Sequence, residues 1–384
     1  MRTKLIDVDN RLSIKFNKTE GLFNWGEDNA YPSLVKSIIG SSTTARRCTE
    51  LNAKYLYGKG FAFVDSITDK SSIIVNSFKH ININQLYRAV TREYAEQNNA
   101  FLIVNYNSLY EIISVDVIHC TDVRVGKQDS LKYSGKFVNY PNFDRSISKA
   151  VNKDEFILID RFNPSPEVIQ AQVDSSGGWN KYRGQILHIK NDFGAIYSLS
   201  DIDSALLDAD SEYQATYNKN RNLRKGFSGL KLIVTKPFAD DERRDEFDRT
   251  VQDLRGSENS SGILLLEAEG ATDVLSEQIF IQNIESNTDD SATAHTEESA
   301  ARAIKKAFGV PSILIDSSDN SVFANSGELL KQSKLEHWEN LEEERSVLID
   351  VFQTIFSRWH SPIIKEVKDW SIKPIIAINT TESE

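Results

Sequence analysis

Acidic side chains form the densest groups of potentially reactive residues in this sequence. One run comprises Asp240, Asp241 and Glu242, with Asp245 close behind, and a second comprises Glu342 to Glu344. Carboxylates bind hard cations when several of them converge on one point. Both runs lie in segments expected to be helical, where consecutive side chains point in different directions. We therefore interpret both runs as solvated faces rather than metal sites.

Two further patterns have the residue types of a reactive site but not its spacing. Gly58-Lys59-Gly60 resembles part of a phosphate-binding loop, but it lacks the full glycine spacing and the Ser or Thr after the Lys. His119 and Cys120 are adjacent on an expected strand, so their side chains point to opposite faces and cannot chelate one ion. The serine-hydrolase elbow, the His-Glu-x-x-His helix and the Cys-x-x-Cys pair are absent from the sequence. The sequence thus predicts no catalytic residue, no metal site and no cofactor.

The polar segment between Asp316 and Gly327 is a third group of residues that could have a function. It is rich in small residues and turn formers, and Val322 and Phe323 are its only bulky apolar pair. A loop that served packing would carry more apolar residues, so these side chains are expected to meet a polar partner. The candidate residues are Asp316, Ser317, Ser318, Asp319, Asn320 and Ser321. An ordinary solvated surface loop is the alternative interpretation.

Two predicted helices flank this segment and would fix its ends. The first covers residues 293–308, is rich in Ala, Glu, Arg and Lys, and is stopped by Gly309 and Pro311. The second runs from Glu328 to about Trp359, with apolar residues mostly at three- and four-residue steps. Such a helix would be roughly 45 Å long, which is more than a small globular core can cover.

The N-terminal part, residues 1–200, predicts an α+β domain. Helices are expected over 32–39, 45–56 and 83–97, with Ser41 to Thr44 available to cap the second. Strands are expected over 100–106, 109–115, 136–140, 155–160 and 185–189, paired in one antiparallel sheet. Ser200 and Asp203 have the spacing of a capping box, which would begin a helix that extends to Lys225.

Residues 227–285 predict a small strand–helix–strand lobe. Its strands are expected over 229–235 and 262–267, and its helix is the acidic segment 240–254. Beyond Trp359, segments 363–367 and 372–378 are expected to return as strands.

The bulk composition restricts the class of protein. A net charge of −11 argues against a protein that wraps nucleic acid by neutralising phosphates. Two cysteines make a disulfide framework improbable and suit a reducing compartment. The first residues lack the apolar core of a signal peptide, and no apolar run approaches the roughly 18 residues that span a bilayer. We therefore expect the protein to begin in the cytoplasm.

The order of these features resembles that of phage portal proteins of the HK97-like type. The resemblance is carried by Ala303-Ile304, by Ala307 to Pro311, by the loop with Asn325 and Glu328, and by the long helix after it. Upstream, the strand at Tyr182 to Ile189 and the segment from Asn29 to Gly60 also match the pattern. The resemblance implies a wing at 1–200, a first stem helix at 201–226, a clip at 227–285 and a second stem helix at 286–310. A tunnel loop at 311–327 and a long wing helix with C-terminal strands and a reduced crown at 328–384 would follow.

The resemblance also implies a function. Portal subunits form a ring of about twelve copies at one capsid vertex, through which double-stranded DNA is packaged and ejected. Asp316 to Ser321 would then face the DNA, and Asp240, Asp241, Glu242 and Asp245 of the clip would face the large terminase and later a tail adaptor. The major capsid protein would surround the ring. The protein would be found in the virion, and in the host cytoplasm during assembly.

Two other functions remain open from the sequence. One is a head–tail adaptor ring, although such adaptors are usually smaller. The other is a metal-dependent, nucleotidyltransferase-like enzyme, which would need an isolated acidic pair at a strand end. No convincing pair of that kind is present in the sequence.

Overall fold

A computed structural model describes residues 14–64, 73–127, 135–140, 143, 153–192, 194–225, 230–235, 245, 249, 263–267, 280–284, 290–316, 326–361 and 363–375. The chain divides into two compact units. Unit 1 comprises residues 1–209 and 302–384, and unit 2 comprises residues 210–301. None of the described helices is long and apolar enough to cross a bilayer.

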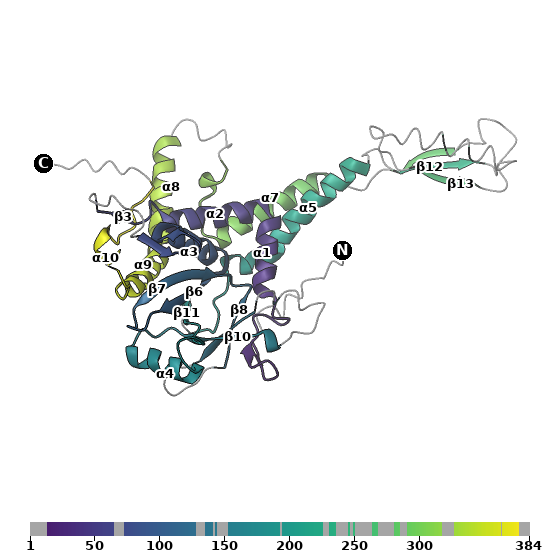
Figure 1. Cartoon of the computed structure of the whole chain (residues 1–384). Helices are drawn as coiled ribbons and strands as arrows, with labels where there is room; N and C mark the ends of the chain where they lie inside the picture. The colour runs from purple at the N-terminus through teal and green to yellow at the C-terminus, as the bar shows by residue number, and fades with distance from the viewer. Residues whose placement is uncertain are drawn as a thin grey trace. The chain divides into compact units, whose positions relative to one another are not determined.

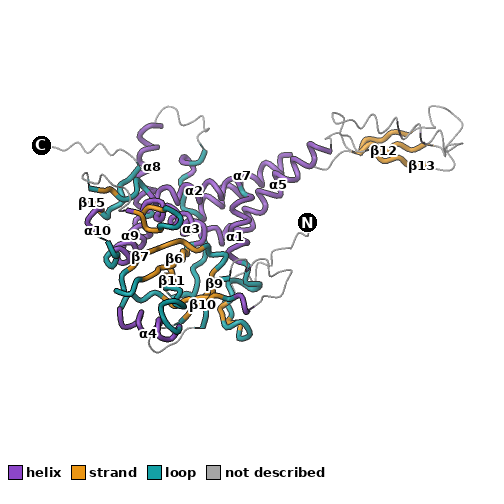
Figure 2. Tube along the Cα trace, in the orientation of Figure 1, coloured by secondary structure: helices purple, strands orange, loops and turns teal. Residues whose placement is uncertain are grey.

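A six-stranded sheet is the centre of unit 1 (Figure 2). Its strands are β6 (Asn99–Tyr106), β7 (Ile112–Ile118), β8 (Val123–Val125), β9 (Lys136–Asn139), β10 (Ile157–Arg161) and β11 (Gln185–Lys190). They follow the order β7-β6-β11-β10-β9-β8. The predicted strands are present, but the prediction of a wholly antiparallel sheet was wrong, because β10 and β11 run parallel. Parallel neighbours need a crossover connection, and α4 (Pro166–Ser176), which the sequence analysis missed, lies within it.

Three helices precede the sheet strands in the chain and pack in unit 1 (Figure 1). They are α1 (Tyr31–Ser41), α2 (Thr43–Tyr57) and α3 (Ile83–Gln97). The Ser42 side chain accepts a hydrogen bond from the Ala45 N–H at 3.0 Å, which confirms the predicted cap of α2. Asn82 and Gln85 form a reciprocal capping box at the start of α3. Local sequence therefore determines where α2 and α3 begin.

The sheet separates two hydrophobic clusters, because alternate residues of a strand point to opposite faces. On β6, Leu102 and Val104 belong to the cluster that includes α3 and the C-terminal helices. Phe101 belongs to the other cluster, which includes α1, Trp25 and Tyr197. The Trp25 and Tyr197 rings stack with centroids 4.2 Å apart. Both faces of the sheet are thus covered within unit 1.

Short strand pairs and turns complete unit 1. The pairs are β1 (Phe16–Asn17) with β2 (Leu22–Phe23), β4 (Ile74–Asn76) with β5 (Ile81–Asn82), and β3 (Ala62–Phe63) with β15 (Val367–Asp369). A 3-10 turn, η3, covers Lys153–Glu155.

The predicted strand at 363–367 is mostly the short helix α10 (Ile363–Glu366), and only Val367 enters a strand. The segment 363–367 has only five residues, which is too short for the spacing of its apolar residues to distinguish a helix from a strand. The other predicted strand, 372–378, is wrong over residues 372–375, which form no strand, and residues 376–378 lie outside the described residues.

The helix after β11 begins differently from the prediction. Residues Asp201–Ala205 form a 3-10 turn, η4, and the α-helix α5 covers Leu206–Lys225. The predicted capping box is wrong, because its two side chains bind elsewhere. The Ser200 hydroxyl donates to the Glu96 carbonyl at 2.6 Å, and Asp203 accepts from the Tyr31 hydroxyl at 2.9 Å. Tertiary contacts within unit 1 therefore replace the local cap.

The C-terminal helices are α7 (Asp290–Ala307), α8 (Ser326–Asn340) and α9 (Glu342–Phe356), with a 3-10 turn, η6, at Ser312–Leu314. The single long helix predicted from Glu328 to about Trp359 is interrupted at Leu341. Arg345 lies at this break. Its guanidinium stacks on the Trp338 ring, 3.6 Å from the centroid, and donates to the Trp338 carbonyl at 2.6 Å. In an uninterrupted helix that carbonyl would accept from the backbone four residues on.

Unit 2 contains a separate three-stranded sheet. Its strands are β12 (Leu230–Thr235), β13 (Ile263–Glu267) and β14 (Phe280–Ile284), with β12 in the centre. The pairing of β12 with β13 is parallel, as a strand–helix–strand lobe requires, and β14 adds an antiparallel edge that the sequence analysis did not foresee.

Candidate functional site

The candidate loop begins directly after the end of α7. Gly309 has a φ of 62°, and the Val310 N–H donates to the Lys305 carbonyl at 3.0 Å, a left-handed helix end that only glycine adopts without strain. The stop predicted at Gly309 is therefore confirmed. Asp316 follows the η6 turn and is the last described residue before the loop.

Asp316 is the one candidate loop residue within the described part of the chain. Its carboxylate lies 2.5 Å from the Lys305 ammonium group of α7, and half of its side chain is exposed. Lys305 itself is buried, so the ion pair fixes the start of the loop to the last turn of α7. Ser317, Ser318, Asp319, Asn320 and Ser321 lie outside the described residues.

The helices at the two ends of the loop both pack against α2. The Asn52 side chain of α2 donates to the Phe308 carbonyl at 3.4 Å, next to the end of α7. On α8, His337 is buried and its ring lies 4.7 Å from the ring of Tyr55 on α2. Burial lowers the pKa of His337 to about 4, so the imidazole is neutral at pH 7. Both flanking helices thus rest on α2.

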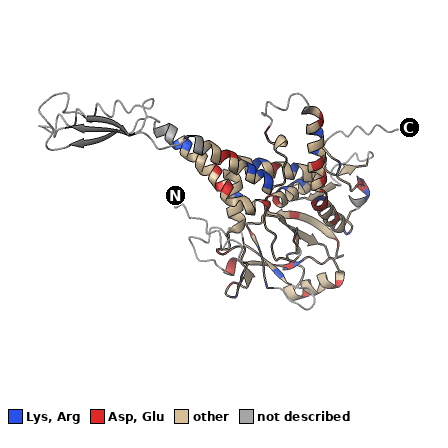
Figure 3. Ribbon diagram, turned by 180° about the vertical axis from the view of Figure 1, so that it is seen from behind, with Lys and Arg blue, Asp and Glu red and all other residues tan. Residues whose placement is uncertain are grey.

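The helices α5 and α7 lie side by side and carry side chains of both charges (Figure 3). Within unit 2, the small residues Ala215 and Ala300 are buried, and the Thr216 hydroxyl donates to Glu297 at 3.5 Å. Beyond Ala215, the described side chains of α5 are exposed, including half of Tyr217. This part of α5 therefore has no hydrophobic core of its own within the described chain.

The acidic residues predicted for the small lobe are only partly described. Asp245 is helical and exposed, as is Arg249 one turn later. Asp240, Asp241 and Glu242 lie outside the described residues. The structure therefore brings no described group of these acids together, and their role stays a prediction.

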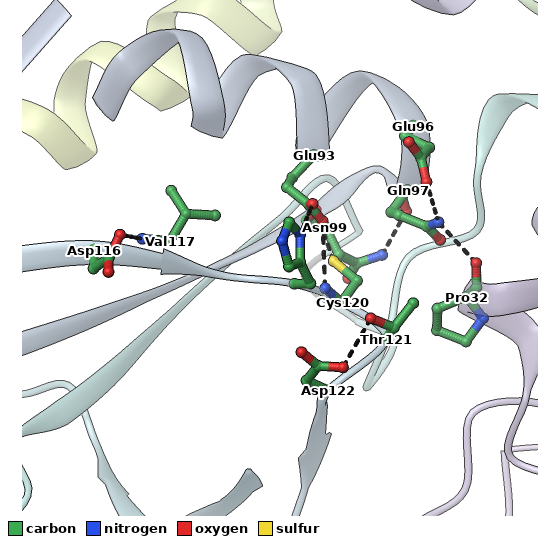
Figure 4. A network of polar contacts seen from close by, with 11 residues as sticks. Pro32, Glu93, Glu96, Gln97, Asn99, Asp116, Val117, Cys120, Thr121 and Asp122 are labelled. Atoms are coloured by element: carbon green, nitrogen blue, oxygen red, sulfur yellow. Dashed lines mark hydrogen bonds and ion pairs between the residues drawn. The ribbon is translucent and has the colours of Figure 1, made fainter. Parts of the chain in front are cut away.

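His119 and Cys120 follow strand β7 and both bond Glu93 of α3. Figure 4 shows Cys120 in this polar network beside Glu93 and Asn99. The His119 ring is hydrogen-bonded to Glu93, and this bond is the main cause that raises the pKa of His119. Cys120 is buried, where its Sγ lies 3.3 Å from the Asn99 carbonyl and desolvation raises the pKa of the thiol. Among the described residues, no group of three His, Cys, Asp or Glu side chains could hold a metal ion.

A family model described as "Phage portal protein" matches residues 77–344. An uncharacterized protein of Rickettsia bellii is 27% identical over 212 residues, which are 52% of this chain and 51% of that protein. One of Rickettsia felis is 27% identical over 188 residues, which are 47% and 45% of the two chains. The chain thus spans about half the length of the curated relatives it matches.

Solved structures that are similar to parts of this chain come from a gene transfer agent particle and from a phage portal protein. A chain of the virion of a native gene transfer agent particle has a TM-score of 0.47 and 16% identity, over 77% of this chain and 73% of that one. An HK97 family phage portal protein from Corynebacterium diphtheriae has a TM-score of 0.39 and 11% identity, over 77% and 82% of the two chains.

Proposed function

The chain belongs to the phage portal protein family, and we propose that it is a portal subunit, a member of a ring through which double-stranded DNA enters and leaves a capsid. The observation that carries this proposal is the extent of the family match. Residues 77–344 include the six-stranded sheet, the helices α5 and α7, the lobe between these helices in the chain and the polar loop after α7. The ring of about twelve copies and the location at one capsid vertex of the virion rest on the family resemblance. The work of such a subunit is mechanical and electrostatic rather than catalytic.

We expect the purified protein to form rings with a central hole. The second half of α5 exposes Tyr217 and has no core within the described chain, so neighbouring subunits are needed to cover it. Negative-stain micrographs and light scattering would measure this. A monodisperse monomer at high protein concentration, with no rings even when capsid or scaffold protein is added, would contradict the proposed function.

The division into parts follows the same proposal. Residues 1–200 would be the wing, 201–226 and 286–310 the stem helices, and 328–384 the outer wing helices with a reduced crown. The lobe at 227–285 would be the clip, which presents Asp240, Asp241, Glu242 and Asp245 to the large terminase and later to a tail adaptor. The major capsid protein would surround the ring, and assembly would take place in the host cytoplasm.

Removal of residues 240–262 is expected to leave capsids that assemble but stay empty. The deletion removes the predicted docking face of the clip, so the terminase would find no attachment. DNA content of purified particles measures the outcome. As a milder variant, Asp240→Asn, Asp241→Asn and Glu242→Gln remove the charges and keep the chain length. Normal DNA filling of the particles made with the deleted chain would show that the clip assignment is wrong.

We further propose that Asp316 to Ser321 form the tunnel loop, which projects toward the DNA. The ends of this loop are held by α7 and α8. Asp319 would repeat around the ring as a collar of negative charge, to which Asp316 adds less because its carboxylate is paired with Lys305. Such a collar repels phosphates and would keep the DNA centred in the channel.

Replacement of Asp316 and Asp319 by Lys is expected to make the passage of DNA sensitive to salt. The change adds on the order of two phosphate contacts per subunit, and each contact steepens the salt dependence of DNA binding. Packaging or ejection should slow at low salt and recover at high salt. The same change of charge at Glu167 and Asp174 on α4 is the matched control. If the loop variant forms rings and alters neither process at any salt concentration, this loop does not touch the DNA.

A further inference from the structure

A basic groove lies between α1, α2 and α3 in unit 1. It is open to solvent and has a volume of about 1030 Å³. Six cationic side chains line it, against the two carboxylates Glu50 and Glu96. The cations are Lys36, Arg46, Arg47, Lys54, Arg88 and Arg92. This excess of positive charge is unexpected in a chain whose net charge is −11.

Most of these cations are available to a partner. All six are exposed, and Arg46 pairs with Glu50 at 3.1 Å one turn later on α2. Arg88 stacks over the Tyr57 ring, 4.7 Å from its centroid, and its side chain is exposed. Among the described residues, no carboxylate forms an ion pair with the other four or with Arg88. The groove therefore presents guanidinium groups that can bind carboxylates in bidentate fashion.

An acidic edge lies on α8 and the first turn of α9. We define it by the exposed residues Glu336, Glu339, Glu342 and Glu343. The buried His337 packs against Tyr55 of α2, and Trp338 also approaches α2 near Gly58. Successive helical residues turn by about 100°, so Glu336 and Glu339 point away from α2.

The basic groove and the side chains of Glu336 and Glu339 therefore lie on opposite sides of the α2–α8 layer. On α2, Tyr55 and Asn52 face α8 and the end of α7. Arg46, Ala53 and Tyr57 lie on the other side of the same helix, where they line the groove. A head-to-tail contact between identical copies needs two different, complementary patches on one subunit. Opposite charges on two faces make such patches complementary.

We infer that the basic groove of one subunit binds the acidic edge of a second copy of this chain, as the neighbour contact of the ring. The inference rests on the proposed ring and identifies the charged residues that would hold neighbouring subunits together. Copies that each carry −11 repel one another, so a basic groove is the region where a neighbour's carboxylates gain most. The same net charge disfavours a nucleic acid as the occupant, because its phosphates would meet the repulsion of the whole subunit.

The test reverses charges on each side and then on both. In Arg88→Glu/Arg92→Glu the groove becomes acidic, and in Glu336→Lys/Glu339→Lys the edge becomes basic. Each double variant is expected to raise the protein concentration needed for half assembly by more than about tenfold, because like charges are then opposed. A chain with all four changes again has complementary faces, so its rings should return. Lys181→Glu/Arg183→Glu changes the net charge equally at exposed sites outside the groove, and should assemble like the unchanged protein.

The possible outcomes separate the inference from the proposed function. Circular dichroism and a thermal melt establish that each variant is folded before assembly is measured by light scattering. Rings that persist in the groove variant, or that the four-change chain fails to restore, would overturn the inference while the unchanged protein still forms rings. Binding of a short DNA duplex that the groove variant loses, with its rings intact, would overturn it too and assign the groove to nucleic acid. Absence of rings from the unchanged protein refutes the proposed function instead.

Discussion

Gly184→Ala should lower the free energy of unfolding by about 3 kcal/mol or more. Gly184 has a φ of 79° immediately before β11, and an added Cβ would lie 2.3 Å from the Val104 carbonyl oxygen of β6. That neighbour is backbone in the centre of the sheet, where Gln185 pairs with Val104, so it cannot move aside alone. Relief of the clash would shift the β6–β11 pairing and the clusters on both faces. Urea unfolding at a fixed protein concentration measures the loss.

Gly178→Ala is the matched control for this prediction. Gly178 also has a positive φ, of 104°, but nothing lies within 4 Å of an added Cβ. Its substitution should cost only the backbone strain of a side chain in this region, about 1–2 kcal/mol. Equal losses in the free energy of unfolding at the two positions would show that the close approach of Gly184 to Val104 does not cause the destabilisation.

Arg124→Ala should destabilise the protein by about 3–5 kcal/mol. Arg124 is fully buried, and its guanidinium donates to the Asn29 carbonyl at 2.7 Å and to the Val123 carbonyl at 2.8 Å. It also lies over the Phe143 ring, 4.6 Å from the centroid. Truncation leaves a cavity and deprives buried carbonyl oxygens of their donors, which costs more than the loss of an exposed side chain. Chemical denaturation followed by circular dichroism gives the difference.

Two further variants test the cause. Arg124→Lys keeps the charge but not the planar fork, so it should fall between the native protein and the Ala variant. Arg183→Ala removes an exposed Arg and should change stability by no more than about 0.5 kcal/mol. A loss at Arg124 no larger than that at Arg183 would mean that the contacts between the segment at Asn29 and strand β8 contribute little.

The sequence by itself determined the features that depend on neighbours in the chain. The Ser42 cap and the start of α3 follow from side chains that bond within a few residues. The end of α7 follows from Gly309, whose backbone adopts a positive φ. The strands β6 and β11 could be recognised from their apolar residues in the same way. The order of these elements along the chain was also enough to indicate the family, which the match over residues 77–344 confirms.

The tertiary structure decided what depends on partners far apart in the chain. The parallel pairing of β10 with β11 comes from a crossover that no local pattern encodes. Ser200 has the spacing of a cap, but its hydroxyl bonds Glu96 of α3 instead. The α8–α9 helix breaks where Arg345 folds back on Trp338, and a run of helix-forming residues contains no sign of this.

The basic groove is the clearest example of a feature that only the tertiary structure determines. Its cations come from three helices, and in the sequence Arg46, Lys54 and Arg88 look like ordinary solvated residues. Only the packing of α1, α2 and α3 places them around one hollow, and only the packing of α2 on α8 sets the acidic edge on the other side. Charge complementarity between faces is a property of three-dimensional positions, whereas sequence patterns report the local preferences of each helix.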